Sequence, residues 1–147
     1  MLFLDASRTW GQPPYYITQM ISKSFRPRCL DVDVESPGDV LDATALTGED
    51  GISLQVANTG NARLKVRVEI VGAAWPSTEV RVTQLTGEID EVNTPSDPER
   101  VVPWERTARA GDERFEFTFA PRSFTILCLR RTTGSSLDVR KTSPEIP

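Results

Sequence analysis

The chain has 147 residues, of which 38% are hydrophobic and 26% are charged, so its composition predicts one globular domain with a real core. Its formal net charge of -4 argues against nucleic acid and anionic membrane surfaces as partners, because both favour a basic face. The sequence contains no histidine, which removes the commonest general base and most zinc sites. Any catalysis would therefore depend on carboxylates, lysine or tyrosine.

The start of the chain predicts neither a signal peptide nor a membrane span. The apolar run at residues 2–4 stops at Asp5 with no basic region before it, and no apolar run approaches the roughly 20 residues of a span. The sequence therefore assigns no compartment. The two cysteines, Cys29 and Cys128, lie far apart, and we expect small core residues rather than a disulfide framework.

Residues 2–26 predict a strand, a loop and a helix. The strand is the apolar run at residues 2–4, and residues 6–12 read as the loop. Pro13-Pro14 suits the first turn of a helix, and Pro27 ends it. The helix is indicated by an apolar stripe at helical spacing, made of Tyr16, Ile17, Met20, Ile21 and Phe25.

From residue 29 onward the apolar period changes to two, which predicts strands with one dry face. Residues 41–45 and 52–56 flank a turn at 48–51 and predict a hairpin. Residues 124–129 are apolar on both faces and predict a central strand. The other predicted strands are 29–35, 64–70, 80–85, 115–119 and a short edge strand near Val101-Val102. The pattern predicts an all-β fold, an antiparallel jelly-roll-type β-sandwich, followed by a disordered tail at 131–147.

Between two of these strands lies a long segment without periodicity, Leu85 to Pro103, with three prolines, five acidic residues and one basic residue. Its carboxylates Glu88, Asp90 and Glu91 belong to the residue types that hydrolyse glycosides. That chemistry needs two carboxyl groups opposed across a sugar, which neighbours on one loop do not provide. We expect a structural loop whose carboxylates accept backbone N–H bonds or reach Arg100 or Arg106.

Three further carboxylates, Asp31, Asp33 and Glu35, would share one face of a strand. Such a row could hold a calcium ion, but Ser36 and Pro37 do not fit a helix–loop–helix calcium loop. We expect a solvated strand face and no metal site.

Five aromatic residues could form a platform on which a sugar ring stacks. The sequence scatters them over three segments, so we expect core or domain-contact residues instead. They are Trp10, Tyr15, Tyr16, Trp75 and Trp104.

The long loop also carries a family resemblance. Leu85-Thr86-Gly87-Glu88, then Asn93-Thr94, then residues 98–103 (PERVVP) resemble the C-terminal domain of family 51 glycoside hydrolases, the α-L-arabinofuranosidases. Residues 120–127 (APRSFTIL) look like the final strand of that domain, and 52–58 look like its central strand, which ends in asparagine.

The resemblance extends to the N-terminal segment. Residues 3–24 resemble the last strand and helix of the family's catalytic (β/α)8 barrel, which implies a barrel remnant at 1–28, a sandwich at 29–130 and a tail at 131–147. Trp10 and Gln12 would follow the final barrel strand, on the face where such barrels keep their active sites. The resemblance therefore makes them candidates for the rim of an arabinose pocket in an intact parent enzyme.

No segment matches the motifs that carry the family's two catalytic glutamates, and a barrel needs roughly 200 residues. The resemblance thus implies an accessory C-terminal domain that lacks catalytic residues and needs no cofactor. Its parent would hydrolyse terminal α-L-arabinofuranosyl residues of arabinan or arabinoxylan. The implied partners are the catalytic barrel and, in a homo-oligomer, other copies of the parent. The alternative is a stand-alone carbohydrate-binding or structural β-sandwich module.

Overall fold

The computed structural model describes residues 1–72, 79–110 and 114–130, and these form an antiparallel β-sandwich with one α-helix. Six strands make the large sheet in the order β3-β4-β5-β10-β7-β8, while β6 and β9 make a small sheet and β1 and β2 a hairpin. The elements are β1 (Leu2–Leu4), β2 (Thr9–Gly11), α1 (Pro13–Lys23), β3 (Arg28–Leu30), the 3-10 turn η1 (Pro37–Asp39), β4 (Leu41–Gly48), β5 (Gly51–Asn58), β6 (Leu64–Glu69), β7 (Glu79–Thr86), β8 (Trp104–Arg109), β9 (Arg114–Phe119) and β10 (Ser123–Arg130). The predicted all-β sandwich is confirmed.

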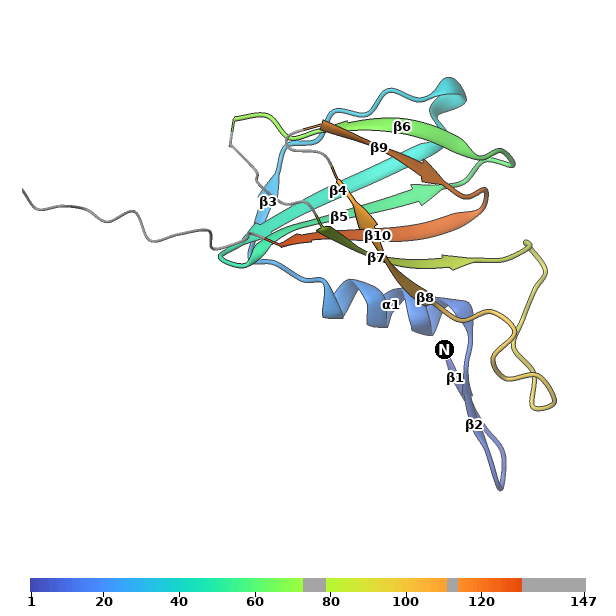
Figure 1. The fold of residues 1–147 in the computed structure, drawn as a ribbon. Helices are drawn as coiled ribbons and strands as arrows, with labels where there is room; N and C mark the ends of the chain where they lie inside the picture. The colour runs from blue at the N-terminus through green and yellow to red at the C-terminus, as the bar shows by residue number, and fades with distance from the viewer. Residues whose placement is uncertain (73–78, 111–113, 131–147) are drawn as a thin grey trace, which may run out of the picture.

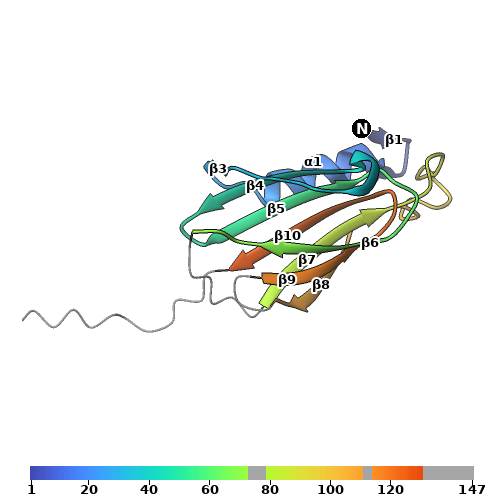
Figure 2. The same cartoon turned by 90° about the horizontal axis from the view of Figure 1, so that it is seen from above.

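The large sheet is covered on both faces. The small sheet packs against one face and α1 lies against the other (Figure 1), and Figure 2 shows the same layers from above. Alternation along each strand sends side chains to both layers. The core under the small sheet holds Val82 and Leu127, both fully buried, against the three phenylalanines of β9. The core under α1 is smaller and holds Met20, Leu85, Val101 and Ile126.

The β4–β5 hairpin was predicted and is present in full register, from Leu41 opposite Asn58 to Gly48 opposite Gly51. Its turn requires glycine at position 51, where φ is 145° and an added Cβ would lie 2.0 Å from the Leu129 carbonyl oxygen. The predicted central strand is also confirmed, because β10 pairs with β5 on one side and β7 on the other.

Helix α1 ends at Lys23, short of the predicted residue 26, and Phe25 lies beyond it with 65% of its surface exposed. The predicted stripe is only partly covered: Met20 is buried, while Ile21 is 40% exposed. Of the helices in the described ranges, none is long and apolar enough to cross a membrane.

The loop predicted at residues 6–12 is wrong, because β2 folds back onto β1 in this stretch. The turn between the two strands is held by Asp5, whose Oδ1 accepts the backbone N–H groups of Ser7 and Arg8, each at 2.8 Å. An aspartate that bonds the backbone two and three residues ahead is a typical turn former. The segment has no apolar alternation that would predict a strand, and this local contact stabilises the turn of the hairpin.

The strand predicted at 29–35 is also wrong beyond Leu30, where β3 ends. Asp31, Asp33 and Glu35 are exposed, so their carboxylates stay in solvent rather than on a paired strand. Among the described residues, no group of three acidic, cysteine or histidine side chains could hold a metal ion.

The cysteines do not both lie in the core: Cys29 is exposed and Cys128 is half-buried, and both are free. Cys29 was predicted to be buried, but it sits on edge strand β3. The register separates the two thiols by β4 and β5, through Leu46 and Ser53. Three strand spacings of about 4.8 Å are too far for a disulfide.

The short strand expected near Val101-Val102 begins instead at Trp104, as β8. Val101 cannot join a sheet ladder, because its N–H and C=O groups both bond to the side chain of Asn93. Its own side chain is buried under α1, with 3% of its surface exposed.

Candidate functional site

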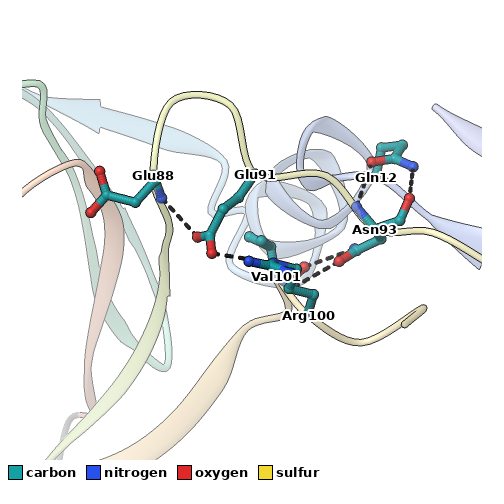
Figure 3. A network of polar contacts seen from close by, with 6 residues as sticks. All are labelled: Gln12, Glu88, Glu91, Asn93, Arg100 and Val101. Carbon is teal, nitrogen blue, oxygen red and sulfur yellow. Dashed lines mark hydrogen bonds and ion pairs between the residues drawn. The ribbon is translucent and has the colours of Figure 1, made fainter. Parts of the chain in front are cut away.

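Residues far apart in sequence meet where the long loop touches the N-terminal segment. We call the contact between Gly11, Gln12, Asn93 and Val101 the clasp. Figure 3 draws Gln12, Asn93 and Val101. Gly11 ends β2, Gln12 precedes the first turn of α1, and Asn93 and Val101 belong to the loop between β7 and β8. The clasp therefore joins the hairpin and helix to the sandwich.

Asn93 is the centre of the clasp and is 2% exposed. Its Nδ2 donates to the carbonyl oxygens of Gly11 at 2.7 Å and Val101 at 2.9 Å, and its Oδ1 accepts the Val101 N–H at 2.7 Å. Both amide protons and the amide oxygen thus have partners, which is what a buried asparagine requires.

Gln12 completes the clasp from the other side. Its Nε2 donates to the Asn93 carbonyl oxygen at 2.6 Å, and its Oε1 accepts the Asn93 N–H at 3.1 Å. The side-chain amide thereby satisfies both main-chain polar groups of Asn93, as a neighbouring strand would. A second tether lies nearby, where Arg8 Nη1 donates to the Pro95 carbonyl oxygen at 2.6 Å.

Gly11 is required by crowding at this point. A Cβ added there would lie 2.6 Å from Cδ1 of Tyr15 and 3.1 Å from Cζ of Tyr16. Because these atoms belong to rings, an alanine would displace the start of α1. The glycine lets the hairpin approach the helix closely enough for Gln12 to reach the loop.

The loop carboxylates behave partly as predicted. Glu91 Oε2 accepts the Glu88 N–H at 2.8 Å, and its Oε1 lies 3.3 Å from Arg100 Nε. Glu88 forms an ion pair with Arg122, which the sequence did not predict. Within the described ranges Arg106 forms no ion pair with the loop carboxylates; its guanidinium lies 5.4 Å from the centre of the Phe117 ring and 5.7 Å from that of Trp104.

The aromatic residues do not gather on one surface within the described part of the chain. Trp10 stacks on Phe3 at 5.9 Å in the hairpin, Tyr15 and Tyr16 meet edge to face, and Trp104 lies on edge strand β8. Trp75 lies outside the described residues. The described aromatics therefore serve separate local contacts.

A cavity of about 230 Å³ lies between β8 and β9, away from the clasp, with Arg106, Glu116 and Phe117 in its lining. The one acidic residue of its lining is Glu116, whose carboxyl group is exposed and whose pKa is lowered by the hydrogen bond and charge of Lys65. The pKa of Asp5 is also lowered, chiefly by the Ser7 backbone N–H. A glycosidase acid needs the opposite shift.

The clasp positions a segment and offers no pair of groups for acid–base chemistry. Sequence reasoning singled out Trp10 and Gln12 by their place after a strand, and the structure puts Gln12 in the clasp and Trp10 in the neighbouring stack. It missed the role of Asn93. The sequence marked Asn93 only as part of the Asn93-Thr94 pair in the family resemblance, and that pair does not indicate what the side chain contacts.

The family model of the alpha-L-arabinofuranosidase C-terminal domain matches residues 1–123. No curated protein matches the chain in sequence.

Solved structures of arabinofuranosidases share the fold. The enzyme of Thermotoga maritima, solved as an arabinose complex, is 22% identical, with a TM-score of 0.79 over 88% of this chain and 31% of that chain. The family 51 enzyme of Thermotoga petrophila is 21% identical, with a TM-score of 0.79 over 87% and 31%. That of Xanthomonas axonopodis pv. citri is 20% identical, with a TM-score of 0.70 over 88% and 28%.

The chain thus spans less than a third of the length of these enzymes. The family match covers the hairpin, the helix and the long loop, and it ends at Ser123, the first residue of β10. The chain belongs to the family of alpha-L-arabinofuranosidase C-terminal domains.

Proposed function

We propose that this domain is the non-catalytic part of a larger arabinofuranosidase, in which it packs against a catalytic barrel and stabilises it. The parent would remove terminal α-L-arabinofuranosyl residues from arabinan- or arabinoxylan-type glycans. Residues 1–28 would belong structurally with the barrel, and residues 29–130 would form the accessory sandwich. The tail at 131–147 lies outside the described residues.

The observation that carries this proposal is the outward face of α1. Pro14, Thr18 and Ile21 are exposed at helical spacing along α1, and Phe25 is exposed just beyond its end. Thr18 Oγ1 donates to the Pro14 carbonyl oxygen at 2.9 Å, so even the polar member of the face has its hydroxyl occupied. An uncharged apolar stripe on a surface helix is typical of a contact face.

The neighbouring hairpin supports the same interpretation. Leu2 is 48% exposed and Leu4 is 73% exposed. Hairpin and helix thus leave apolar side chains without cover, although the clasp holds both to the sandwich. A partner body that covers them would account for both features, and the solved relatives have about two thirds of their chains beyond the part matched here.

A stand-alone sugar-binding module is the second candidate, but no observation favours it. Such a module needs aromatic rings presented together. Within the described residues, Trp10 and Trp104 lie on different elements, in the hairpin and on edge strand β8.

The first test is hydrolysis of 4-nitrophenyl α-L-arabinofuranoside by the 147-residue chain. We expect no turnover above the uncatalysed rate, because the described carboxylates include no opposed acid and nucleophile, and turnover at enzyme-like rates would contradict the proposal. Titration calorimetry with arabinan and arabinoxylan oligosaccharides should show no binding at millimolar ligand. Saturable binding would favour the stand-alone module.

The second test concerns the parent. The reading frame that precedes the codon of Met1 in the source genome is sequenced, and the extended protein is produced as one chain. We expect a barrel with two glutamates and hydrolysis of the aryl arabinofuranoside. An upstream sequence that encodes no barrel, or an extended protein without this activity, would contradict the assignment.

A further inference from the structure

We propose that Asn93 is the positioning residue through which the sandwich fixes the N-terminal hairpin, and with it the Trp10–Gln12 step. This coupling goes beyond the proposed function. One part rests on the proposed function: that Trp10 and Gln12, which the hairpin carries, border a sugar pocket in the parent enzyme.

The chemistry of one side chain carries the argument. Asn93 binds Gly11, 82 residues away in sequence, and Val101, 8 residues away, with a single amide group. An amide is needed, because two carbonyl oxygens require donors and one N–H requires an acceptor. An aspartate could serve the N–H but would place its negative charge against both carbonyls.

Gln12 makes the contact reciprocal. It binds the main chain of Asn93 with both of its amide atoms, while the side chain of Asn93 binds the main chain of Gly11. The two residues therefore clamp each other's backbone at the point where β2 leads into α1. Gly11 also pairs with Leu2 in the hairpin ladder, so a contact that holds Gly11 to the loop holds the hairpin to it as well.

The loop is itself fastened at its sandwich end. Glu88 pairs with Arg122, in the turn between β9 and β10. Arg122 is held in turn by its N–H to the Gly60 carbonyl at 3.0 Å and its Nε to Asn61 Oδ1 at 3.0 Å. A continuous path of polar contacts thus runs from the sandwich turns through the loop to the clasp, and part of it is drawn in Figure 3.

The test is hydrogen exchange, read by mass spectrometry, on the full 147-residue chain and on Asn93→Ala. We expect the protection of residues 2–12 to fall by about 10- to 100-fold, as the loss of a buried hydrogen-bonding group implies. Protection in β5 and β10 should stay unchanged. The matched control is Thr94→Val, because the Thr94 hydroxyl bonds only to Ser96 and Asp97 within the loop.

Two outcomes would overturn the proposal. Unchanged protection of residues 2–12 in Asn93→Ala would show that the hairpin does not depend on the clasp. An equal loss of protection in β5 and β10 would show that Asn93 is a general stability residue rather than a positioning residue.

Two further variants keep the test decisive if Asn93→Ala does not fold. Gln12→Met keeps the size of the side chain but removes both bonds to the Asn93 peptide, so it should release residues 2–12 and leave the Asn93–Val101 contact protected. Asn93→Asp should release the hairpin at pH 7, because a carboxylate keeps the acceptor for the Val101 N–H but offers no donor to the carbonyl oxygens of Gly11 and Val101. Full protection of residues 2–12 in Gln12→Met, or in Asn93→Asp at pH 7, would contradict the clasp. These readouts use no arabinofuranoside, so their failure is separable from failure of the proposed function.

Discussion

At the scale of single residues, short polar side chains hold three of the segments that connect strands. Asn58, at the end of β5, donates from Nδ2 to the carbonyl oxygens of Ala62 at 3.0 Å and Ala120 at 2.8 Å. Asn93 does the same in the long loop, and Asp5 accepts two N–H groups in the hairpin turn. Each of these side chains supplies hydrogen bonds to main-chain groups that have no partner in a sheet ladder, so each segment depends on one side chain.

The Asp5 turn should depend on pH. The pKa of Asp5 is lowered from 3.8, and the backbone N–H of Ser7 is the largest cause; desolvation opposes it, and the Arg8 N–H and the Ser7 hydroxyl lower the pKa further. A carboxyl whose pKa is lower in the folded state stabilises the fold above pH 3.8, and that contribution is lost as the pH falls through the lowered value. We therefore expect the Ser7 and Arg8 amides to lose protection at low pH.

Exchange of these two amides, measured by NMR as a function of pH and corrected for intrinsic rates, would check the prediction. Asp5→Asn is the control, because an amide keeps the acceptor oxygen and does not titrate. A pH dependence that persists in Asp5→Asn would assign the effect to another group.

The clasp shows which part of the site the sequence could reveal. The family resemblance made Gln12 a candidate rim residue through its place after the expected final barrel strand, and that role stays a prediction. The role of Asn93 could not be inferred, because its partner Gly11 lies 82 residues away and the bonded group is a main-chain carbonyl. Main-chain acceptors carry no sequence signal, so an asparagine in a loop gives no indication of which backbone it binds.

At the scale of elements, apolar alternation predicted the strands that face a core. Strands β5, β9 and β10 were predicted within two residues at each end, since their alternate side chains fill the space between layers. Alternation failed at the edges. Residues 31–35 alternate but stay unpaired and exposed, whereas β8 pairs with β7 although its sequence, WERTAR, is mostly charged and polar. Charged side chains on an edge strand protect it from pairing with other chains. The same charges remove the apolar alternation by which a strand is predicted.

Helix α1 leads to a prediction about self-association. We expect the isolated chain to associate through apolar side chains at the end of this helix, since Ile21 on its outward face is 40% exposed and Phe25, just beyond it, is 65% exposed. The double variant Ile21→Ser/Phe25→Ser should shift sedimentation toward the monomer without lowering the melting temperature, because neither side chain belongs to the core clusters.

Lys23→Ser is the matched control, since Lys23 lies at the end of the same helix and is exposed but polar. It should sediment like the unmodified chain. A double variant that associates as strongly as the unmodified chain would place the self-contact on another surface.

At the scale of the whole molecule, strand β10 contributes side chains to both hydrophobic cores. β10 sends Leu127, which is 0% exposed, into the core under the small sheet, and Ile126, which is 2% exposed, into the core under α1. The two cores therefore lie on opposite faces of the same strand. This arrangement predicts that the helix layer and the sandwich unfold together, although the sequence assigned residues 1–28 and 29–130 to separate units.

Alanine substitutions at these two neighbours test that cooperativity. Leu127→Ala and Ile126→Ala should each lower the free energy of unfolding by about 2–5 kcal/mol, the range for large-to-small changes in a packed core. If the layers form one unit, both variants will show a single unfolding transition, with circular dichroism and tryptophan fluorescence reporting the same midpoint. If instead Ile126→Ala frees α1 at a denaturant concentration where β5 and β10 remain protected from exchange, the helix is a separate unit. Its stability would then depend on the clasp and on the partner that covers its outward face.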